Sequence, residues 1–168
     1  MPDMRDAMRG AGFRGRKPQD GQQRGPHGGF QPRSTGSPSN AFPLGYPQYF
    51  SSEGRLRVEL VTTEAENLAA KFEADKLKRH QLRAFYDHAK RQLQRLTYGV
   101  PFEEVHPEVA RLRAFAADRA ARSENALPLS FKEFIDRNVN AATTPSAFQK
   151  GFMPHFEAVV AYCARIKD

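Results

Sequence analysis

The sequence predicts an all-α protein: a compact bundle of about five helices preceded by a disordered N-terminal tail. Across residues 62–168, apolar side chains recur at spacings of three and four, which is the period of an amphipathic helix. Residues 1–50 hold 9 of the 12 Gly and 7 of the 12 Pro. Such a segment has too little apolar surface to offset the entropy of ordering its backbone. Residues 51–61 form a transition segment between the tail and the helical domain.

The first two predicted helices cover residues 62–74 and 76–97. Thr63 to Glu66 matches a capping box for the first, in which the Thr hydroxyl and the Glu carboxylate cover free N–H groups. The apolar side of the first helix has Ala65, Leu68, Ala69 and Phe72, and that of the second has Leu82, Phe85, Tyr86, Ala89, Leu93 and Leu96. Gly99 and Pro101 end the second helix. Only residues 56–60 alternate like a strand, and five residues cannot make a sheet.

The third helix is predicted at about 103–122, and Pro107 leaves a later start open because proline is tolerated best in a first turn. A fourth helix follows Pro128, with a second possible capping box at Ser130 to Glu133. The apolar residues of these two helices are Val105, Val109, Leu112, Phe115, Ala116 and Ala120, then Phe131, Phe134, Ile135 and Val139.

A fifth helix is predicted at 146–166. Its apolar side has Phe148, Phe152, Phe156, Val159, Val160, Cys163 and Ile166. Gly151 and Pro154 lie inside it, so we expect either a kink near 150–154 or a break into a short and a longer helix.

Composition excludes several classes of protein. The chain has 168 residues, 26 Lys+Arg and 19 Asp+Glu, for a net charge of +7. This length suits one domain with a tail and leaves no room for a large multidomain enzyme. The sequence lacks an apolar run of about 18 residues and a secretion signal, so we expect a cytoplasmic protein without a membrane span. The lone Cys163 excludes an internal disulfide framework and a cysteine-based zinc finger.

The tail carries a net charge of +4 and the domain a net charge of +3. The tail could be a start-site extension or a flexible linker without a role, or a weak nucleic-acid-binding arm whose Arg and Phe side chains meet phosphates and bases. Four aromatic residues at its end offer surface that could dock on the domain: Phe42, Tyr46, Tyr49 and Phe50.

No catalytic residue, metal site or cofactor is predicted. The five histidines have no Cys or second His at ligand spacing. Glu103 and Glu104 are adjacent, so they point apart on a helix and form no acid–base pair. Phosphate-binding glycine motifs are absent from the domain. Cys163 lies on an apolar face, which is typical of a structural thiol.

Positive charge is the functional signal of the sequence. Helix 76–97 carries seven basic residues against one acid, Asp87. One-sided charge of this kind suits a polyanion, although a plain solvated face remains an alternative. The candidate RNA-binding residues are Lys76, Lys78, Arg79, Arg83, Lys90, Arg113, Arg119 and Arg122. The phenylalanines are predicted to be core and not a stacking platform, so binding would use phosphate and sugar contacts with little sequence preference.

Three segments resemble one known family, the small subunit of type III-A CRISPR effector (Csm) complexes. They are KLKRHQLRAFYDHAK at 76–90, LRAFAADRAAR at 112–122 and FMPHFEAVVAYCARIKD at 152–168. The resemblance covers about residues 62–168. It implies a bundle of about five helices without catalytic activity. Copies of the chain would stack on one another and pack against the backbone and large subunits.

The resemblance also implies that a basic surface faces the guide RNA–target RNA duplex. It carries over Lys76, Arg83, Arg113 and Arg122, whereas Lys78, Arg79, Lys90 and Arg119 come from the charge pattern alone. Phe156, Glu157 and Tyr162 are expected in packing or subunit contacts. The alternative is a helical adaptor whose basic face binds an acidic protein without RNA contact.

Overall fold

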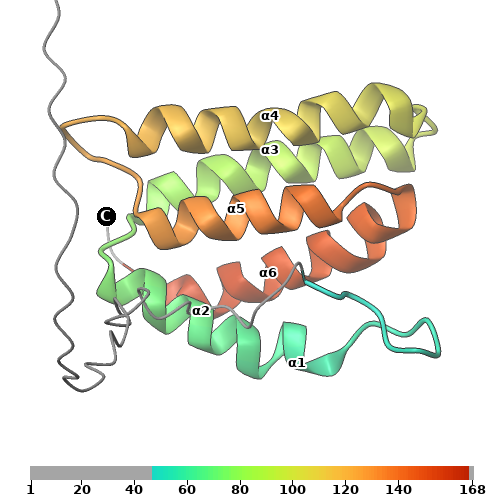
Figure 1. Cartoon of the computed structure of the whole chain (residues 1–168), viewed down its shortest axis with the longest axis horizontal. Helices are drawn as coiled ribbons and strands as arrows, with labels where there is room; N and C mark the ends of the chain where they lie inside the picture. The colour runs from blue at the N-terminus through green and yellow to red at the C-terminus, as the bar shows by residue number, and fades with distance from the viewer. Residues whose placement is uncertain (1–46, 167–168) are drawn as a thin grey trace, which may run out of the picture. The chain divides into compact units, whose positions relative to one another are not determined.

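The computed structural model describes residues 47–166, which fold into helices joined by short connections (Figure 1). The elements are α1 (Val58–Val61), α2 (Thr63–Ala74), α3 (Arg79–Thr97), α4 (Phe102–Ala120), α5 (Leu129–Ala141), the π-helix η1 (Ala147–Phe152), α6 (Met153–Tyr162) and the 3₁₀-helix η2 (Cys163–Arg165). The all-α prediction is confirmed. Residues 1–46 of the predicted disordered tail lie outside the described residues. The last four residues of that tail, 47–50, are instead ordered, with Tyr49 buried and Phe50 in an isolated bridge to Leu56.

The helices close into a ring around one core. α4 packs against both α3 and α5, α6 packs against α2 and α3, and α2 contacts α5. Short connections make neighbours in sequence antiparallel, as Figure 1 shows for α3, α4 and α5. The C-terminal end of α4 therefore lies at the same end of the bundle as the N-terminal end of α3. Within the described part of the chain, no helix is long and apolar enough to cross a membrane.

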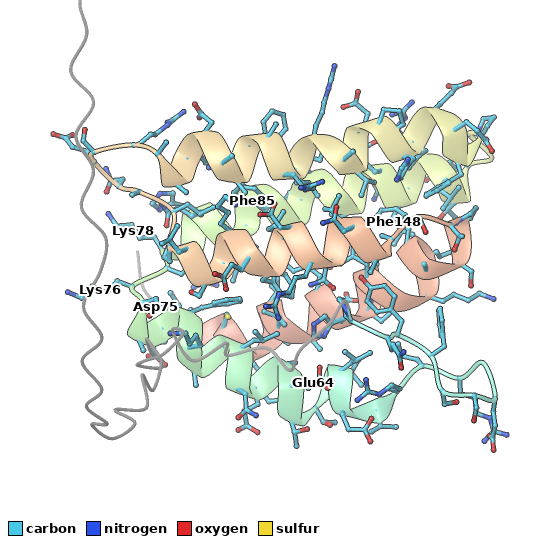
Figure 2. All side chains as sticks on the ribbon, viewed as in Figure 1. Glu64, Asp75, Lys76, Lys78, Phe85 and Phe148 are labelled. Atoms are coloured by element: carbon cyan, nitrogen blue, oxygen red, sulfur yellow. The ribbon has the colours of Figure 1, made fainter. Side chains whose placement is uncertain are left out.

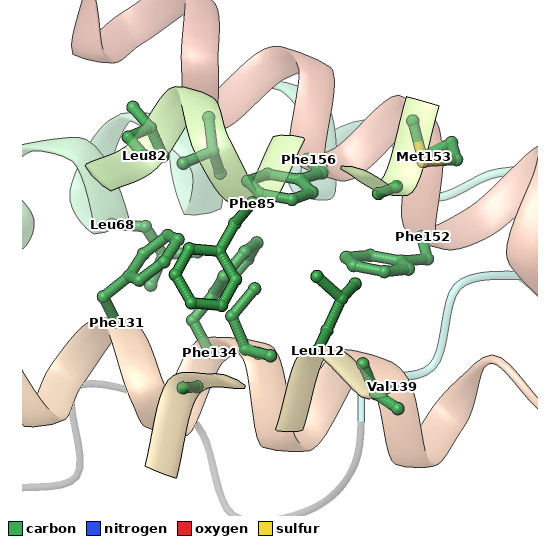
Figure 3. Close-up of a cluster of buried hydrophobic side chains, with 14 of the residues drawn as sticks. Leu68, Leu82, Phe85, Leu112, Phe131, Phe134, Val139, Phe152, Met153 and Phe156 are labelled. Carbon is green, nitrogen blue, oxygen red and sulfur yellow. The ribbon is translucent and has the colours of Figure 1, made fainter. Parts of the chain in front are cut away.

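Phenylalanine rings fill the centre of the ring of helices (Figure 3). Phe72 and Phe131 meet edge-on with ring centroids 5.2 Å apart, and Phe134 and Phe156 do so at 5.3 Å. Such pairs add to the stabilisation from burial itself. The predicted apolar faces of α2 and α5 are buried throughout: Ala65, Leu68, Ala69, Phe72, Phe131, Phe134, Ile135 and Val139. The prediction that Phe115 belongs to the core is wrong, since this residue is 44% exposed at the edge of the apolar stripe of α4.

The second long helix begins at Arg79 and not at residue 76 as predicted. Lys76 has φ +61°, its N–H bonds the Glu73 carbonyl, and the N–H of Leu77 bonds the Phe72 carbonyl. This is a Schellman motif, which ends a helix with one left-handed residue. Leu77 is buried beside it. Lys76 therefore lies in a loop, and the predicted charge stripe on the helix loses its first member.

Neither predicted capping box forms. The N-cap of α2 is Thr62, whose Oγ1 donates to the Val58 carbonyl instead. α5 begins before Ser130, with Pro128 as N-cap and its carbonyl accepting the first backbone bonds. Ser130 is thus the second residue of the helix, and its buried Oγ has no hydrogen-bond partner within the described residues. In both cases the preceding residues start the helix earlier than the local pattern suggests.

α4 starts at Phe102, so the later start that Pro107 left open is not adopted and the proline lies within the helix. The expected irregularity near 150–154 is a change of helix type. The wide π-turns of η1 pass directly into α6, and Pro154 occupies the first turn of α6, where its missing N–H is harmless. There is no loop between the two.

An N-terminal clasp, residues 47–57, packs on this π-helix. Tyr49 is buried, and its hydroxyl donates to Asn138 Oδ1 at 2.9 Å. Phe50 and Leu56 form an isolated antiparallel bridge. The strand-like pattern of residues 56–60 gives no longer strand, because α1 begins at Val58. A Cβ on Gly151 would lie 2.4 Å from Cγ of Tyr49, so only glycine leaves room for the ring.

Candidate functional site

Six of the eight predicted cationic residues lie toward one end of the bundle: Lys76, Lys78, Arg79, Arg83, Arg119 and Arg122. The antiparallel packing of α3 and α4 brings them there, because the first turns of α3 meet the last turns of α4. Figure 2 shows Lys76 and Lys78 projecting from the connection between α2 and α3. We call this set the basic end of the bundle.

Three members of the basic end are available to an external anion. Lys76, Arg79 and Arg83 are exposed, and their side chains have no ion-pair or hydrogen-bond partner among residues 47–166. Many basic side chains elsewhere in the described chain have a carboxylate within 4 Å, as in the pairs Arg57–Glu64, Lys71–Asp75, Arg111–Glu108 and Lys132–Asp136. The contrast makes α3 and the loop before it the most strongly unbalanced cationic surface described.

Lys78 acts as a tether at the start of α3. It is half-buried, and its Nζ donates to Oδ1 of Asn125 in the connection between α4 and α5. Gln81 makes the same link from a buried position: its Oε1 accepts from the Lys78 N–H, and its Nε2 donates to the Asn125 carbonyl at 2.7 Å. Sequence reasoning missed Gln81, although it lies next to Leu82 at the margin of the apolar face.

Lys90 and Arg113 are not brought together with the others. Lys90 lies 5.4 Å from the centre of the Tyr86 ring, and its hydrogen bond with the Tyr86 hydroxyl raises the pKa of Lys90. Tyr86 in turn donates to Glu157 on α6. Arg113 points to α5, where its Nε is 3.4 Å from Asp136 Oδ1. Both cations have partners within the chain, away from the basic end.

A groove between α3 and α4 has a volume of about 470 Å³, and sequence reasoning did not foresee it. Its walls combine aromatic and charged side chains: Ala84, Phe85, Asp87, His88, Arg91, Leu112, Phe115, Asp118, Arg119 and Arg122. Arg119 lies over the Phe85 ring at 5.6 Å, and Arg122 pairs with Asp118 at 2.6 Å. Arg91 was counted among the basic residues of its helix, but only the packing of α4 reveals that it faces two more arginines.

The groups with perturbed pKa values lie elsewhere. Burial raises the pKa of the Cys163 thiol to about 12, with a smaller contribution from Glu73. Burial also lowers the pKa of His155, whose Nδ1 bonds the Leu60 carbonyl at 2.6 Å. Among residues 47–166, no three side chains of the metal-binding types gather. The basic end itself presents cationic side chains, which attract anions.

Comparison with known proteins adds one match. The model of the Csm2 Type III-A family matches residues 55–167, which is most of the chain and all of its described helices. No curated protein and no solved structure matches. The matched segment includes the three stretches that carry the resemblance noted from the sequence, apart from the last residue of the third. The chain therefore belongs to the Csm2 family and is a small subunit of the type III-A Csm complex.

Proposed function

We propose that this chain is a non-catalytic subunit that contacts RNA, lining the guide RNA–target RNA path with its basic end. In this proposal the bundle packs against the backbone and large subunits and against further copies of itself, in a cytoplasmic ribonucleoprotein for antiviral defence. Family membership supports a place in the complex. The contact with RNA rests on the surface of the chain itself.

The observation that carries the proposal is the set of unpaired cations Lys76, Arg79 and Arg83. A polyanion gains affinity wherever a Lys or Arg replaces its condensed counterions. Cations already paired with carboxylates gain less from a phosphate, because they must first lose their partner. The basic end is therefore the part of the described surface best suited to a sugar–phosphate backbone, and its contacts would carry little sequence preference.

The backbone at Lys76 gives independent support. α3 ends in the same motif as α2, and there the left-handed position is held by Gly99 with φ +90°. A side chain in this conformation costs roughly 1–2 kcal/mol relative to the right-handed region. At the end of α2 a lysine takes the position that glycine fills at the end of α3. Strain of this kind concentrates at functional sites.

The test measures binding of the full chain to RNA as a function of salt. Arg79→Gln with Arg83→Gln should weaken binding to a guide–target RNA duplex and reduce the slope of log K against log salt by roughly 0.7–0.9 for each lost phosphate contact. Arg55→Gln with Arg111→Gln is the matched control, since both arginines are exposed and already paired with glutamates. Wild-type affinity and slope in the Arg79/Arg83 variant would refute RNA contact through this surface.

Crosslinking separates RNA contact from the adaptor alternative. In the assembled complex, RNA containing 4-thiouridine should crosslink to the segment 76–90. If an acidic protein is bound there instead, the wild-type complex should give no RNA crosslink at 76–90, and the Arg79/Arg83 variant should fail to assemble. That second outcome would replace the RNA proposal with a protein-binding one.

A further inference from the structure

We propose that the groove between α3 and α4 binds one unpaired nucleotide of RNA, with the base against Phe115 and the phosphate among Arg91, Arg119 and Arg122. The inference rests on the proposed RNA contact and adds a second, different mode to it. The basic end would hold the backbone of a duplex, whereas the groove would hold a base that has left its stack.

The groove has the size and lining of a small-ligand site. Its volume of about 470 Å³ falls within the range of roughly 300–1,000 Å³ that such sites occupy. Phe85 and Leu112 are buried in its floor, whereas Phe115 leaves 44% of its surface open. The core does not need this ring, since Leu112 and Ala116 already complete the buried side of α4.

Phe115 is held in place by a second ring. His88 of α3 meets it edge-on, with centroids 5.6 Å apart and planes at 85°. The His88 ring is itself oriented, because its Nε2–H donates to the Glu108 carbonyl at 2.9 Å. A held aromatic surface binds a base without a further loss of side-chain freedom, and every base has a face that can stack.

The charges around Phe115 favour an anion. Arg91 faces the groove from α3 and has no partner among residues 47–166, while Arg119 is positioned by its contact with the Phe85 ring. Arg122 pairs with Asp118, and both side chains are well exposed, so Arg122 adds less to the binding of a phosphate than Arg91, which has no partner among the described residues. Three arginines stand against Asp87 and Asp118, which leaves the groove net positive.

The combination points to a nucleotide and not to an acidic protein segment. A carboxylate needs the arginines but not an open aromatic ring, and an apolar side chain needs the ring but not three guanidinium groups. An unpaired nucleotide uses both, because its base stacks and its phosphate pairs. The groove also shares α3 with Arg79 and Arg83, so one strand could reach both sites.

The experiment compares two single-stranded oligomers of equal length: oligoadenylate, and the same ribose–phosphate chain without bases. The full wild-type chain should prefer the base-bearing oligomer. Phe115→Leu should lower affinity for oligoadenylate about fivefold or more, by loss of one stacking contact, and leave the abasic oligomer unchanged. Tyr98→Leu is the control, since Tyr98 is 87% exposed and lies outside the groove.

Two further variants keep the result interpretable. Phe115→Tyr retains a ring and should retain the preference for bases, whereas unchanged binding of the abasic oligomer by Phe115→Leu excludes a folding defect as the cause of its lower affinity for oligoadenylate. Arg91→Gln should weaken binding of both oligomers and lower the salt slope. If Phe115→Leu binds both oligomers like wild type while Arg79→Gln with Arg83→Gln weakens duplex binding, the groove proposal fails and the RNA proposal stands. If neither set of variants changes binding, both proposals fail.

Discussion

At the scale of single residues, a charged side chain occupies a position whose left-handed backbone conformation favours glycine. Lys76 ends α2 with φ +61°, and nothing in the described structure forces a lysine there. Its N–H and that of Leu77 complete the hydrogen bonds that close the helix, as glycine does for α3. The side chain itself is exposed and has no partner in the described residues. Its positive charge is what distinguishes this residue from the glycine at the end of α3.

Lys76→Gly should raise the free energy of unfolding by up to about 1 kcal/mol, because relief of the left-handed strain exceeds the added freedom of the unfolded chain. The same variant should bind RNA more weakly. Urea unfolding and RNA titration of the full chain measure the two effects. Gly99→Lys provides the reverse change, in open space, and should destabilise by about 1 kcal/mol or more. A loss of stability in Lys76→Gly would contradict the assignment of strain.

At the scale of elements, the ends of the helices depend on what precedes and follows them. The Thr63 and Ser130 patterns both match a capping box, yet each residue lies within its helix because Thr62 and Pro128 are the N-caps. At α3, Gln81 covers the N–H of Lys78 and bonds the Asn125 carbonyl across the bundle. The start of α3 thus depends on a residue 44 positions away in the chain.

The clasp and the π-helix should depend on each other. Gly151→Ala would set a methyl group 2.4 Å from Cγ of Tyr49, so we expect destabilisation of about 1–3 kcal/mol, typical of overpacking. In a Tyr49→Ala background the same change should cost far less, since the ring is gone. Urea unfolding of the wild type, both single variants and the double variant gives the coupling energy. Additive effects would show that the two residues do not compete for space.

At the scale of the whole molecule, one buried titratable group links the two ends of the described chain. His155 of α6 is packed against Phe134, and its Nδ1–H donates to the carbonyl of Leu60 in α1. Burial lowers the pKa of His155 below its ordinary value of 6.5. The folded chain therefore takes up a proton on this histidine at a lower pH than the unfolded chain does.

Stability should thus be at its full value above pH 6.5 and decline as the pH falls from there toward the lowered pKa. The limiting slope for one group is about 1.4 kcal/mol per pH unit. Urea unfolding at pH 7.5 and 5.5 measures the decline, and His155→Gln should reduce it. The more exposed His106 serves as the control site, since His106→Gln should leave the decline in place. An unchanged pH dependence in His155→Gln would contradict the argument.

Much of this fold follows from local patterns. The apolar residues at positions 65, 68, 69 and 72 define one face of α2, and those at 131, 134, 135 and 139 define one face of α5; all are buried. Periodicity of this kind needs no knowledge of the partner helix, because any partner must cover the same stripe. The prediction that Phe115 is buried is wrong because this residue lies at the edge of the apolar stripe. At such a position the neighbouring helix determines whether the side chain is buried in the core or open to the groove.

The amino-acid sequence alone determined the helical class, the buried faces, the position of the excess positive charge and the resemblance to the family that matches residues 55–167. These features are periodic, compositional or motif-based, so they survive without coordinates. Only the tertiary structure decided which cations share a surface. The antiparallel pairing of α3 and α4 places Arg91, Arg119 and Arg122 in the same groove as Phe115. Arg113 instead pairs with Asp136, and Lys90 contacts the Tyr86 ring. Such groupings depend on distances between helices, which one chain's local pattern does not contain.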